Sequence, residues 1–424
     1  MRVFLSCLVC RIVTFVLHKL GRGATSMPGK VALKVKRNVL KDLSENTKVI
    51  VVTGTNGKTT SCRILEEGLK KAGKSYFINK SGANLITGVT ASFIMNSTIT
   101  GKCKKDYAII ECDENAFKEV SRYIHCDVIL VTNVFRDQLD RYGEVTHTLN
   151  AIKESVKNLP NAIVCLDADC SLTYSMSKEI PNKIITFGVN VPFDKNAKAP
   201  EISDAKYCIF CKHEYDYTYH TYGHLGGFVC PNCGYKRPQP DFAVESVEEM
   251  KNDHSVVVAN LNGDRNIIRV NIGGAYNIYN AIGCAAALTA FGIDEKTVID
   301  AIEHFNGAFG RMEHFKAGDN TVNLILVKNP AGFSQTMNFL KNIDDDFTLI
   351  LSLNDNAADG RDISWIWDVD FAGIFEKANV KEIYVTGKRC YDMAVRVKYE
   401  GVGNREIKII ENEDYNKLVD IATS

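Results

Sequence analysis

The chain has 424 residues, and its 51 Lys and Arg residues balance its 51 Asp and Glu residues. This length exceeds what one small core accommodates and predicts two or three domains, while a net charge of zero gives no support for a nucleic-acid partner, whose binding surface needs a basic excess. Fourteen cysteines, most of them scattered, indicate free thiols in a reducing cytoplasm and not a secreted disulfide scaffold.

Residues 1–45 form an N-terminal leader that begins with the apolar stretch MRVFLSCLVCRIVTFVLHKLGRG. Arg11 divides this stretch into runs too short to span a bilayer, and no convincing cleavage site of a signal peptide follows it. Two interpretations stay open. The segment is a helix packed on the next domain, which periodicity favours, or a helix at a membrane surface, where its basic residues meet anionic headgroups.

Residues 48–60, KVIVVTGTNGKTT, predict a buried strand that leads into a phosphate-binding loop. The β-branched residues 49–52 suit a strand covered on both faces, and two glycines then mark the turn. A helix that opens at Lys58 offers unpaired N–H groups to a triphosphate, while its lysine neutralises the outer oxygens and Thr59 supplies a hydroxyl for Mg²⁺. The residues expected to hold ATP here are Gly54, Thr55, Asn56, Gly57, Lys58, Thr59 and Thr60.

Helix and strand patterns alternate after this loop, which predicts an α/β fold with a mostly parallel sheet covered by helices. Ligands on such sheets gather at the carboxyl ends of the strands. The expected strands end in the polar clusters Thr53-Gly54, Glu111–Glu114 and Thr132-Asn133. Asp113 and Glu114 also fit a solvated acidic turn. The expected strands cover residues 48–53, 107–112, 127–134, 162–166, 183–188, 256–260 and 267–272.

Four cysteines in an insertion at about residues 200–240 have the spacing of a zinc ribbon. Each CxxC turn can direct two thiolates at one ion, and two such turns complete a closed tetrahedron with no position left for substrate. We therefore expect a structural Zn²⁺ held by Cys208, Cys211, Cys230 and Cys233.

The loop GTNGKTT has Val52 where the full phosphate-loop pattern has its first glycine, and this shorter form resembles the loop of the Mur ligase and folylpolyglutamate synthetase superfamily. The resemblance implies an ATP-dependent ligase that makes an acyl phosphate from a carboxylate and lets an amine displace the phosphate. It implies that Glu111 helps Thr59 hold Mg²⁺, that Asn277 lies in the helix that meets the adenine, and that Arg311 in GRME reaches the phosphates.

The same resemblance divides the rest of the chain. Residues 46–314 are expected to form the central ATP-binding domain with the zinc ribbon inserted, and residues 315–424 a smaller C-terminal α/β domain. The chain stops at DIATS, before the final strand and helix usual in the family, so we expect either a shortened or partial protein or a smaller domain that is completed differently.

DQLDRYGE at 137–144, the four-cysteine insertion and NDNAADGRDISWIWDVDF at 354–371 resemble the MurT family, the ligase-like subunits of lipid II isoglutaminyl synthase. This implies amidation of the α-carboxyl group of D-glutamate in the lipid II stem peptide, at the inner face of the plasma membrane. The ammonia would come from a partner, the glutaminase subunit GatD, and Asp355 would complete the catalytic triad of that subunit.

Two other functions stay in view. An amino-acid-adding Mur ligase, or a ligase like folylpolyglutamate synthetase, would act alone and would not need the zinc ribbon. A nucleotide-gated scaffold would use the ribbon and the small domain only for docking, and Glu111 beside a complete loop argues against it.

Overall fold

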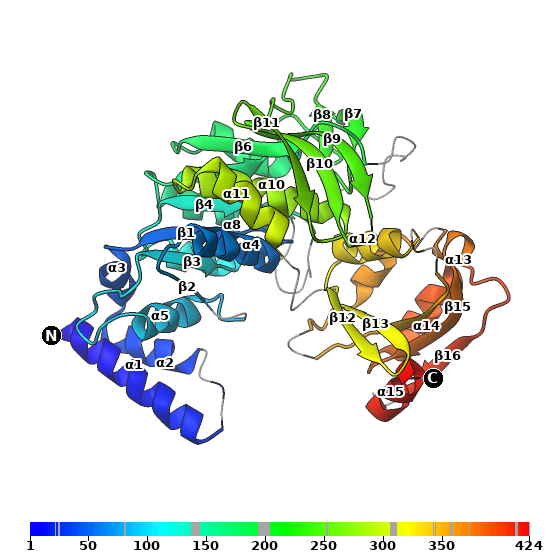
Figure 1. The fold of residues 1–424 in the computed structure, drawn as a ribbon, viewed down its shortest axis with the longest axis horizontal. Helices are drawn as coiled ribbons and strands as arrows, with labels where there is room; N and C mark the ends of the chain where they lie inside the picture. The colour runs from blue at the N-terminus through cyan, green and yellow to red at the C-terminus, as the bar shows by residue number, and fades with distance from the viewer. Residues whose placement is uncertain are drawn as a thin grey trace. The chain divides into compact units, whose positions relative to one another are not determined.

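The computed structural model describes the chain except residues 22, 24, 25, 80, 81, 137–144, 194–203, 252, 306–311, 342, 344, 357, 358, 372, 412, 413 and 424. The chain divides into two compact units (Figure 1). The first comprises Met1–Val134 and Thr146–Phe305, and the second comprises Phe135–Val145 and Asn306–Ser424. The domain boundaries placed after residues 45 and 314 stay predictions.

A nine-stranded sheet forms the centre of the first unit, in the order β11-β10-β9-β6-β5-β4-β1-β3-β2. Neighbouring strands run parallel from β2 to β9, and β10 is antiparallel to β9 and β11. The predicted α/β fold with a mostly parallel sheet is confirmed. The strands are β1 (Lys48–Thr53), β2 (Tyr76–Ile78), β3 (Tyr107–Glu111), β4 (Val128–Val131), β5 (Ile163–Asp167), β6 (Ile184–Val189), β9 (Phe242–Met250), β10 (Ser255–Leu261) and β11 (Asp264–Val270).

Helices cover this sheet, as the alternating pattern predicts. Ile64, Leu65 and Leu69 form the buried face of α4, and a Cβ on Gly68 would lie 2.5 Å from Leu288 of α10, so the glycine permits close packing of the two helices. Within the described residues before 306, the helices are α1 (Arg2–Lys19), α2 (Met27–Val35), α3 (Val39–Ser44), α4 (Lys58–Lys71), α5 (Ile86–Met95), α6 (Glu114–Val120), α8 (Val145–Lys157), α9 (Ser171–Ser175), η1 (Met176–Lys178), α10 (Ala275–Ala290) and α11 (Glu295–His304).

The register of the parallel strands brings three polar strand ends to one edge. Val52 of β1 lies opposite Glu111 of β3 on one side and Leu130 of β4 on the other. Because the three strands end within a residue of one another, the residues that follow them meet at the carboxyl edge of the sheet. This is the edge on which a parallel sheet binds ligands.

The cysteine insertion forms a small module around the hairpin of β7 (Asp216–His220) and β8 (Gly226–Val229). Its own apolar cluster contains Cys208, Tyr215, Phe228, Cys230 and Tyr235. Aromatic rings pack closely in it, with Phe228 and Tyr235 centroids 5.3 Å apart.

The second unit contains a parallel three-stranded sheet in the order β14-β15-β16 and the separate hairpin β12-β13. The strand β13 (Asn320–Ile325) pairs with β12 in this hairpin and lies outside the three-stranded sheet. The hydrophobic core of the second unit contains apolar residues such as Phe371, Ile374, Ile383 and Val385. The elements are β12 (Met312–Ala317), β13 (Asn320–Ile325), α12 (Pro330–Leu340), β14 (Phe347–Ser352), η2 (Ser364–Asp368), α13 (Ile374–Lys377), β15 (Val380–Thr386), α14 (Cys390–Tyr399), β16 (Ile407–Ile410) and α15 (Tyr415–Thr423).

Candidate functional site

The predicted phosphate loop lies between the end of β1 and the start of α4. Gly54 has φ of 120° and Gly57 has φ of 86°, in the left-handed region that favours glycine. A Cβ on Gly54 would lie 2.4 Å from Thr132 Oγ1, and one on Gly57 would lie 2.1 Å from Asn280 Oδ1. Both glycines are therefore required by the backbone conformation and by close neighbours.

Lys58 lies in the first turn of α4 with its side chain buried. Its Nζ donates to the carbonyl oxygens of Gly54 at 2.5 Å and Thr55 at 3.3 Å, and it forms an ion pair with Glu114 Oε1 at 2.5 Å. Glu114, at the start of α6, is only 3% exposed, so the interpretation as a solvated acidic turn is wrong for this residue. Burial raises the pKa of its carboxyl group, against the opposing effect of the Lys58 charge.

The end of β4 holds the other side of the loop. The Thr55 N–H donates to the Asn133 carbonyl oxygen at 2.9 Å, and the Asn56 N–H donates to Asn133 Oδ1 at 3.0 Å. Thr132 Oγ1 donates to the Asn56 carbonyl oxygen at 2.7 Å. These hydrogen bonds from the end of β4 fix the backbone of the loop. The first N–H groups of a helix such as α4 make no hydrogen bond within the helix and can bind an anion.

The first turns of α10 lie against the loop. Asn280 contacts Gly57, and its Nδ2 donates to Asn277 Oδ1 at 2.9 Å. Asn277 Nδ2 donates to the Gly273 carbonyl oxygen at 2.6 Å, and the Asn277 residue is only 6% exposed. The structure therefore gives the two asparagines a role in joining α10 to the phosphate loop, whereas contact of Asn277 with an adenine stays a prediction.

Glu111 ends β3 beside the loop, as expected. Asn79 fixes its backbone from both directions, because Asn79 Oδ1 accepts the Glu111 N–H at 2.8 Å and Asn79 Nδ2 donates to the Glu111 carbonyl oxygen at 2.9 Å. Thr59 is half-buried at the start of α4. A carboxylate and a hydroxyl are hard oxygen donors that fit Mg²⁺, so these residues suit the proposed metal.

Arg311 in GRME and the DQLDRYGE motif at 137–144 lie outside the described part of the chain.

The four cysteines of the ribbon converge, with their Sγ atoms all within 4.8 Å of one another. Cys208 and Cys233 are 3.6 Å apart, and Cys211 and Cys230 are 3.4 Å apart. A tetrahedral zinc ion with bonds of about 2.3 Å places its sulfurs about 3.8 Å apart. Hydrogen bonds from the Asn232 side chain and the His213 backbone lower the pKa of the Cys211 thiol to about 6, which favours the thiolate that a metal needs.

A buried charge network, which the sequence analysis missed, connects the ribbon with α10. Asp169 follows β5, and its carboxylate accepts hydrogen bonds from Arg237 Nε at 2.6 Å and from the Val189 N–H at 2.9 Å. It also accepts a hydrogen bond from the Tyr279 hydroxyl of α10. Arg237 directly follows the cysteine module. The signal for it was the Asp-Ala-Asp sequence at the end of β5, on the same edge as the other polar strand ends.

In the second unit, Asp355 follows β14 and forms an ion pair with Arg389 Nη1 at 3.2 Å. Arg389 also binds Asp392 through Nε at 2.8 Å. Lys388 donates its N–H to Asn354 Oδ1 at 2.8 Å, which holds the segment beside the end of β15. The Asp355 side chain stays 32% exposed, so a carboxylate of fixed orientation is presented at the surface of this unit.

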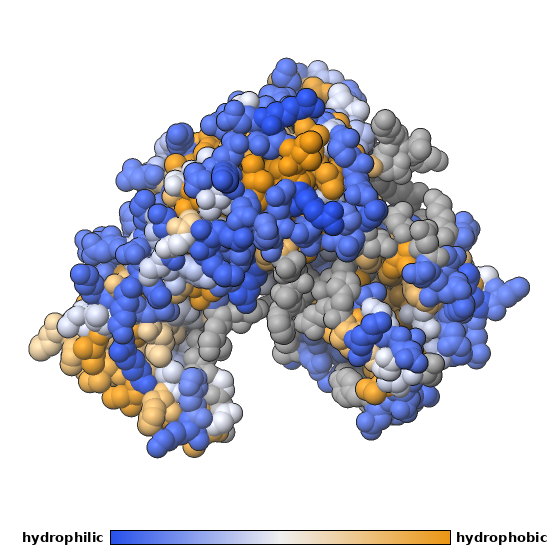
Figure 2. Space-filling view, viewed as in Figure 1, coloured by the Kyte–Doolittle hydropathy of each residue, from blue (hydrophilic) through white to orange (hydrophobic). Residues whose placement is uncertain are grey.

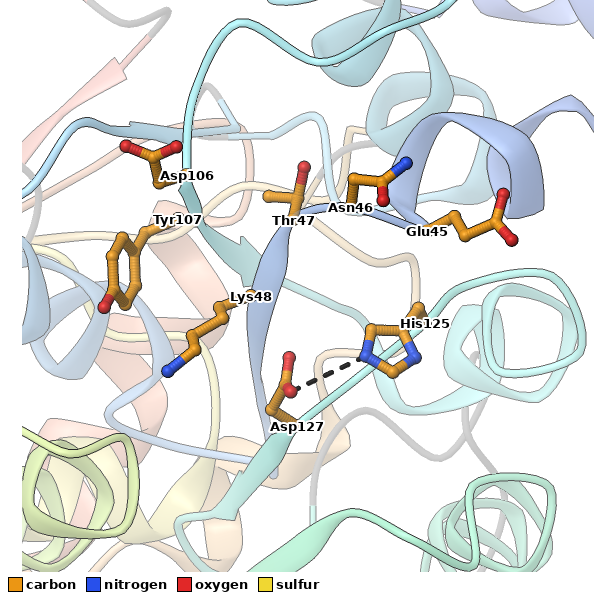
Figure 3. A pocket seen from close by; sticks show the side chains of 8 residues that line it. All are labelled: Glu45, Asn46, Thr47, Lys48, Asp106, Tyr107, His125 and Asp127. Atoms are coloured by element: carbon orange, nitrogen blue, oxygen red, sulfur yellow. Dashed lines mark ion pairs between the residues drawn. The ribbon is translucent and has the colours of Figure 1, made fainter.

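A cavity of about 300 Å³ lies at the opposite edge of the large sheet, where β1, β3 and β4 begin (Figure 3). Lys48, Tyr107 and Asp127 line it, and Asp127 lies 3.5 Å from His125. Asp127 Oδ2 also accepts the N–H of Val49. Because the phosphate loop lies at the carboxyl edge, this cavity takes no part in the candidate site.

Comparisons with known proteins place this site in a family context. Residues 52–234 match the Mur ligase middle domain, and residues 326–424 match the MurT ligase C-terminal family. The chain is 35% identical to a Streptococcus pneumoniae protein named lipid II isoglutaminyl synthase (glutamine-hydrolyzing) subunit MurT, over 100% of this chain and 95% of that protein. A Staphylococcus aureus protein of the same name is 33% identical over 94% of this chain and 87% of its own length.

A solved structure extends the comparison to the fold. The pseudomurein peptide ligase type C from Methanothermus fervidus superposes with a TM-score of 0.65 at 22% identity, over 87% of this chain and 68% of that one. The two chains therefore share a fold.

Proposed function

Because the chain belongs to the MurT family, we propose that the residues described above perform the ligase half of lipid II isoglutaminyl synthase. The chain is an ATP-dependent ligase of peptidoglycan biosynthesis, which amidates the α-carboxyl group of D-glutamate in lipid II to D-isoglutamine. This assignment rests on similarity along the whole chain and on the phosphate loop, in which close neighbours fix the glycines and hydrogen bonds fix the lysine. This assignment prevails over an amino-acid-adding ligase that acts alone.

The loop residues from Gly54 to Thr60 would bind the ATP phosphates, with Lys58 neutralising their charge and Arg311 contributing a second cation. Thr59 and Glu111 would hold Mg²⁺, which when bound neutralises charge between the phosphates and the substrate carboxylate. A carboxylate oxygen of the substrate attacks the terminal phosphorus and ADP leaves. Ammonia then attacks the acyl carbon and inorganic phosphate leaves. The protein supplies positioning and charge more than covalent chemistry.

Lys58 must change partners in this scheme. Its ammonium group donates to two loop carbonyls and to Glu114, so a phosphate oxygen would take over at least one of those bonds. The raised pKa of Glu114 favours this exchange of hydrogen-bond partners, because the carboxyl group can bind a proton when the Lys58 ammonium group leaves it for a phosphate oxygen.

Zn²⁺ would be held by the four ribbon cysteines and would stabilise the module without joining the reaction, since four protein ligands close the tetrahedron. The sulfur spacing supports this role.

The name of the relatives describes a subunit, which implies a partner. We assign that partner as the glutaminase GatD, which would release ammonia from glutamine. The exposed carboxylate of Asp355 would orient a histidine of the partner and stabilise its imidazolium form. The ion pair with Arg389 supports this proposal, because it fixes the carboxylate.

A pair of substitutions separates this role from simple ion pairing. Asp355→Asn should abolish glutamine-dependent amidation by the complex and leave amidation with added ammonium salt unchanged. Asp392→Asn is the matched control, because it removes the other carboxylate on Arg389. Equal glutaminase activity in the wild type and Asp355→Asn would remove Asp355 from the triad.

The ligase assignment is tested with the purified complex, Mg²⁺, ATP and lipid II. Mass spectrometry of the released muropeptide should show the loss of about one mass unit that accompanies replacement of hydroxyl by amine in an amide. Added amino acids in place of glutamine or ammonia should give no product. An amino acid adduct would instead support a ligase that acts alone.

The lipid anchor of the substrate would bring this reaction to the cytoplasmic face of the plasma membrane, so we propose a peripheral location there. Among the described residues, no helix is both long enough and apolar enough to cross a bilayer.

A further inference from the structure

Helix α1 packs on the first unit with its polar residues inward. Its buried residues are Ser6, Cys7, Cys10 and Thr14. Ser6 Oγ donates to the Ala32 carbonyl oxygen of α2 at 2.9 Å, and Arg11 Nη2 donates to the Ile94 carbonyl oxygen near the end of α5 at 3.1 Å. The helix is thus held by small side chains and hydrogen bonds. The structure confirms the packed interpretation of the leader, whereas the interpretation as a helix at a membrane surface stays a prediction.

The outward side of this helix is apolar. We call it the apolar face of α1, and it consists of Phe4, Leu5, Ile12, Phe15, Val16 and the following Leu20. Phe15 is 61% exposed and Leu20 is 66% exposed. Figure 2 shows apolar side chains gathered over α1 at the lower left of the view. A contiguous exposed apolar surface of this kind marks an interaction site more often than a scattered exposed residue does.

The charged residues of the N-terminal segment that contains this face all have one sign. The first 41 residues contain no Asp or Glu and nine basic residues, whereas the whole chain is neutral. Lys19 Nζ lies 4.9 Å from the centre of the Phe15 ring, so a cation borders the apolar face directly. Arg2, Lys30 and Lys34 are exposed as well. The nine basic residues are Arg2, Arg11, Lys19, Arg22, Lys30, Lys34, Lys36, Arg37 and Lys41.

We propose that the apolar face of α1 docks this protein on an anionic lipid surface. The helix has 18 residues and is therefore about 27 Å long. It would lie in the headgroup region with its apolar side chains toward the acyl chains and with Arg2 and Lys19 on the phosphates. A second copy of the chain would bring the same positive charges together, which disfavours a dimer through this face. The inference rests on the proposed function, since docking would hold the enzyme beside a lipid-linked substrate.

Vesicle flotation tests the proposal with the intact complex. Vesicles of equal parts phosphatidylglycerol and phosphatidylcholine should bind the wild type at least about tenfold more tightly than vesicles of phosphatidylcholine alone, and added salt should weaken binding. The triple variant Phe4→Ser, Ile12→Ser, Phe15→Ser should lose about tenfold or more in binding. Ile267→Ser, at a residue of β11 that is 70% exposed, is the matched control and should bind as the wild type does.

A second variant keeps the test independent of how well the triple variant folds. Phe15→Trp places an indole on the face, and its fluorescence should shift to the blue when anionic vesicles are added. The wild type gives the background, because Trp365 and Trp367 lie in the other unit. No shift, or wild-type binding that the triple variant keeps, would overturn the proposal. A wild-type dimer that the triple variant converts to a monomer would assign the face to a second copy instead.

Activity measurements separate this inference from the assigned function. With a water-soluble stem peptide that lacks the lipid, the triple variant should amidate as fast as the wild type, while with lipid II in vesicles it should be slower. If the wild type amidates neither substrate, the assigned function fails. If both proteins amidate lipid II in vesicles equally well, the docking proposal fails.

Discussion

Gly57→Ala tests the joint between the phosphate loop and α10. Gly57 has φ of 86°, so an alanine there carries left-handed strain of about 1–2 kcal/mol. Its Cβ would also lie 2.1 Å from Asn280 Oδ1, and overpacking of this kind costs about 1–3 kcal/mol. The free energy of unfolding of the first unit should therefore fall by about 2–5 kcal/mol. For a unit of this size that corresponds to roughly 4–10 °C in Tm.

Gly73→Ala is the matched control for backbone strain. Gly73 has φ of 64° at the end of α4, and an added Cβ there meets no atom within 4 Å. Its substitution should cost only the strain of about 1–2 kcal/mol. The difference between the two variants isolates the contact with Asn280.

Asn280→Ala removes the amide that the new methyl group would meet. By itself it should cost about 1 kcal/mol, because the hydrogen bond to Asn277 is lost. The double variant Gly57→Ala, Asn280→Ala should lose about 1–3 kcal/mol less free energy of unfolding than the sum of the losses of the two single variants.

Thermal unfolding followed by far-UV circular dichroism measures these differences. Tryptophan fluorescence reports the second unit alone, since Trp365 and Trp367 both lie there. The reasoning is refuted if Gly57→Ala and Gly73→Ala destabilise equally, or if Asn280→Ala gives no relief.

Three further changes address the lysine, the metal and the buried carboxyl pair. Lys58→Ala should weaken ATP binding roughly tenfold to a hundredfold, because one charge-assisted hydrogen bond contributes about 1.5–3 kcal/mol; unchanged affinity by calorimetry would contradict its role. Metal analysis should find one zinc ion per chain, and Cys208→Ser should lose both the zinc and thermal stability; a zinc-free variant with the wild-type Tm would argue against a structural ion. Burial raises the pKa of Asp167 well above its ordinary value, so the stability it contributes is fully present at acid pH and is lost as pH rises through the raised pKa. Asp167→Asn mimics the protonated acid and should flatten this decline when urea unfolding is followed as pH rises above the ordinary pKa of an aspartate; parallel pH profiles for the two proteins would show that Asp167 does not cause the decline.

The local sequence was enough to predict the phosphate loop, the helix that starts at Lys58, the strands β1, β3, β5 and β6 and the convergence of the four cysteines. Each of these features depends on neighbouring residues. A β-branched run, a glycine with positive φ and a CxxC turn each indicate the same local structure in different tertiary contexts. The short strand β2 and the charged strand β9 were not predicted, because their residues carry little local pattern and pairing with neighbours decides them.

Only the tertiary structure decided which polar residues are buried together. Lys58 and Glu114 are 56 positions apart in the sequence, and Asp169 and Tyr279 are 110 apart, so no local pattern could pair them. The same holds for α1, whose mainly apolar composition does not by itself decide which side of the helix is buried. Its direction of packing depends on hydrogen bonds to α2 and α5 that exist only in the folded chain, and those bonds turn its apolar face outward.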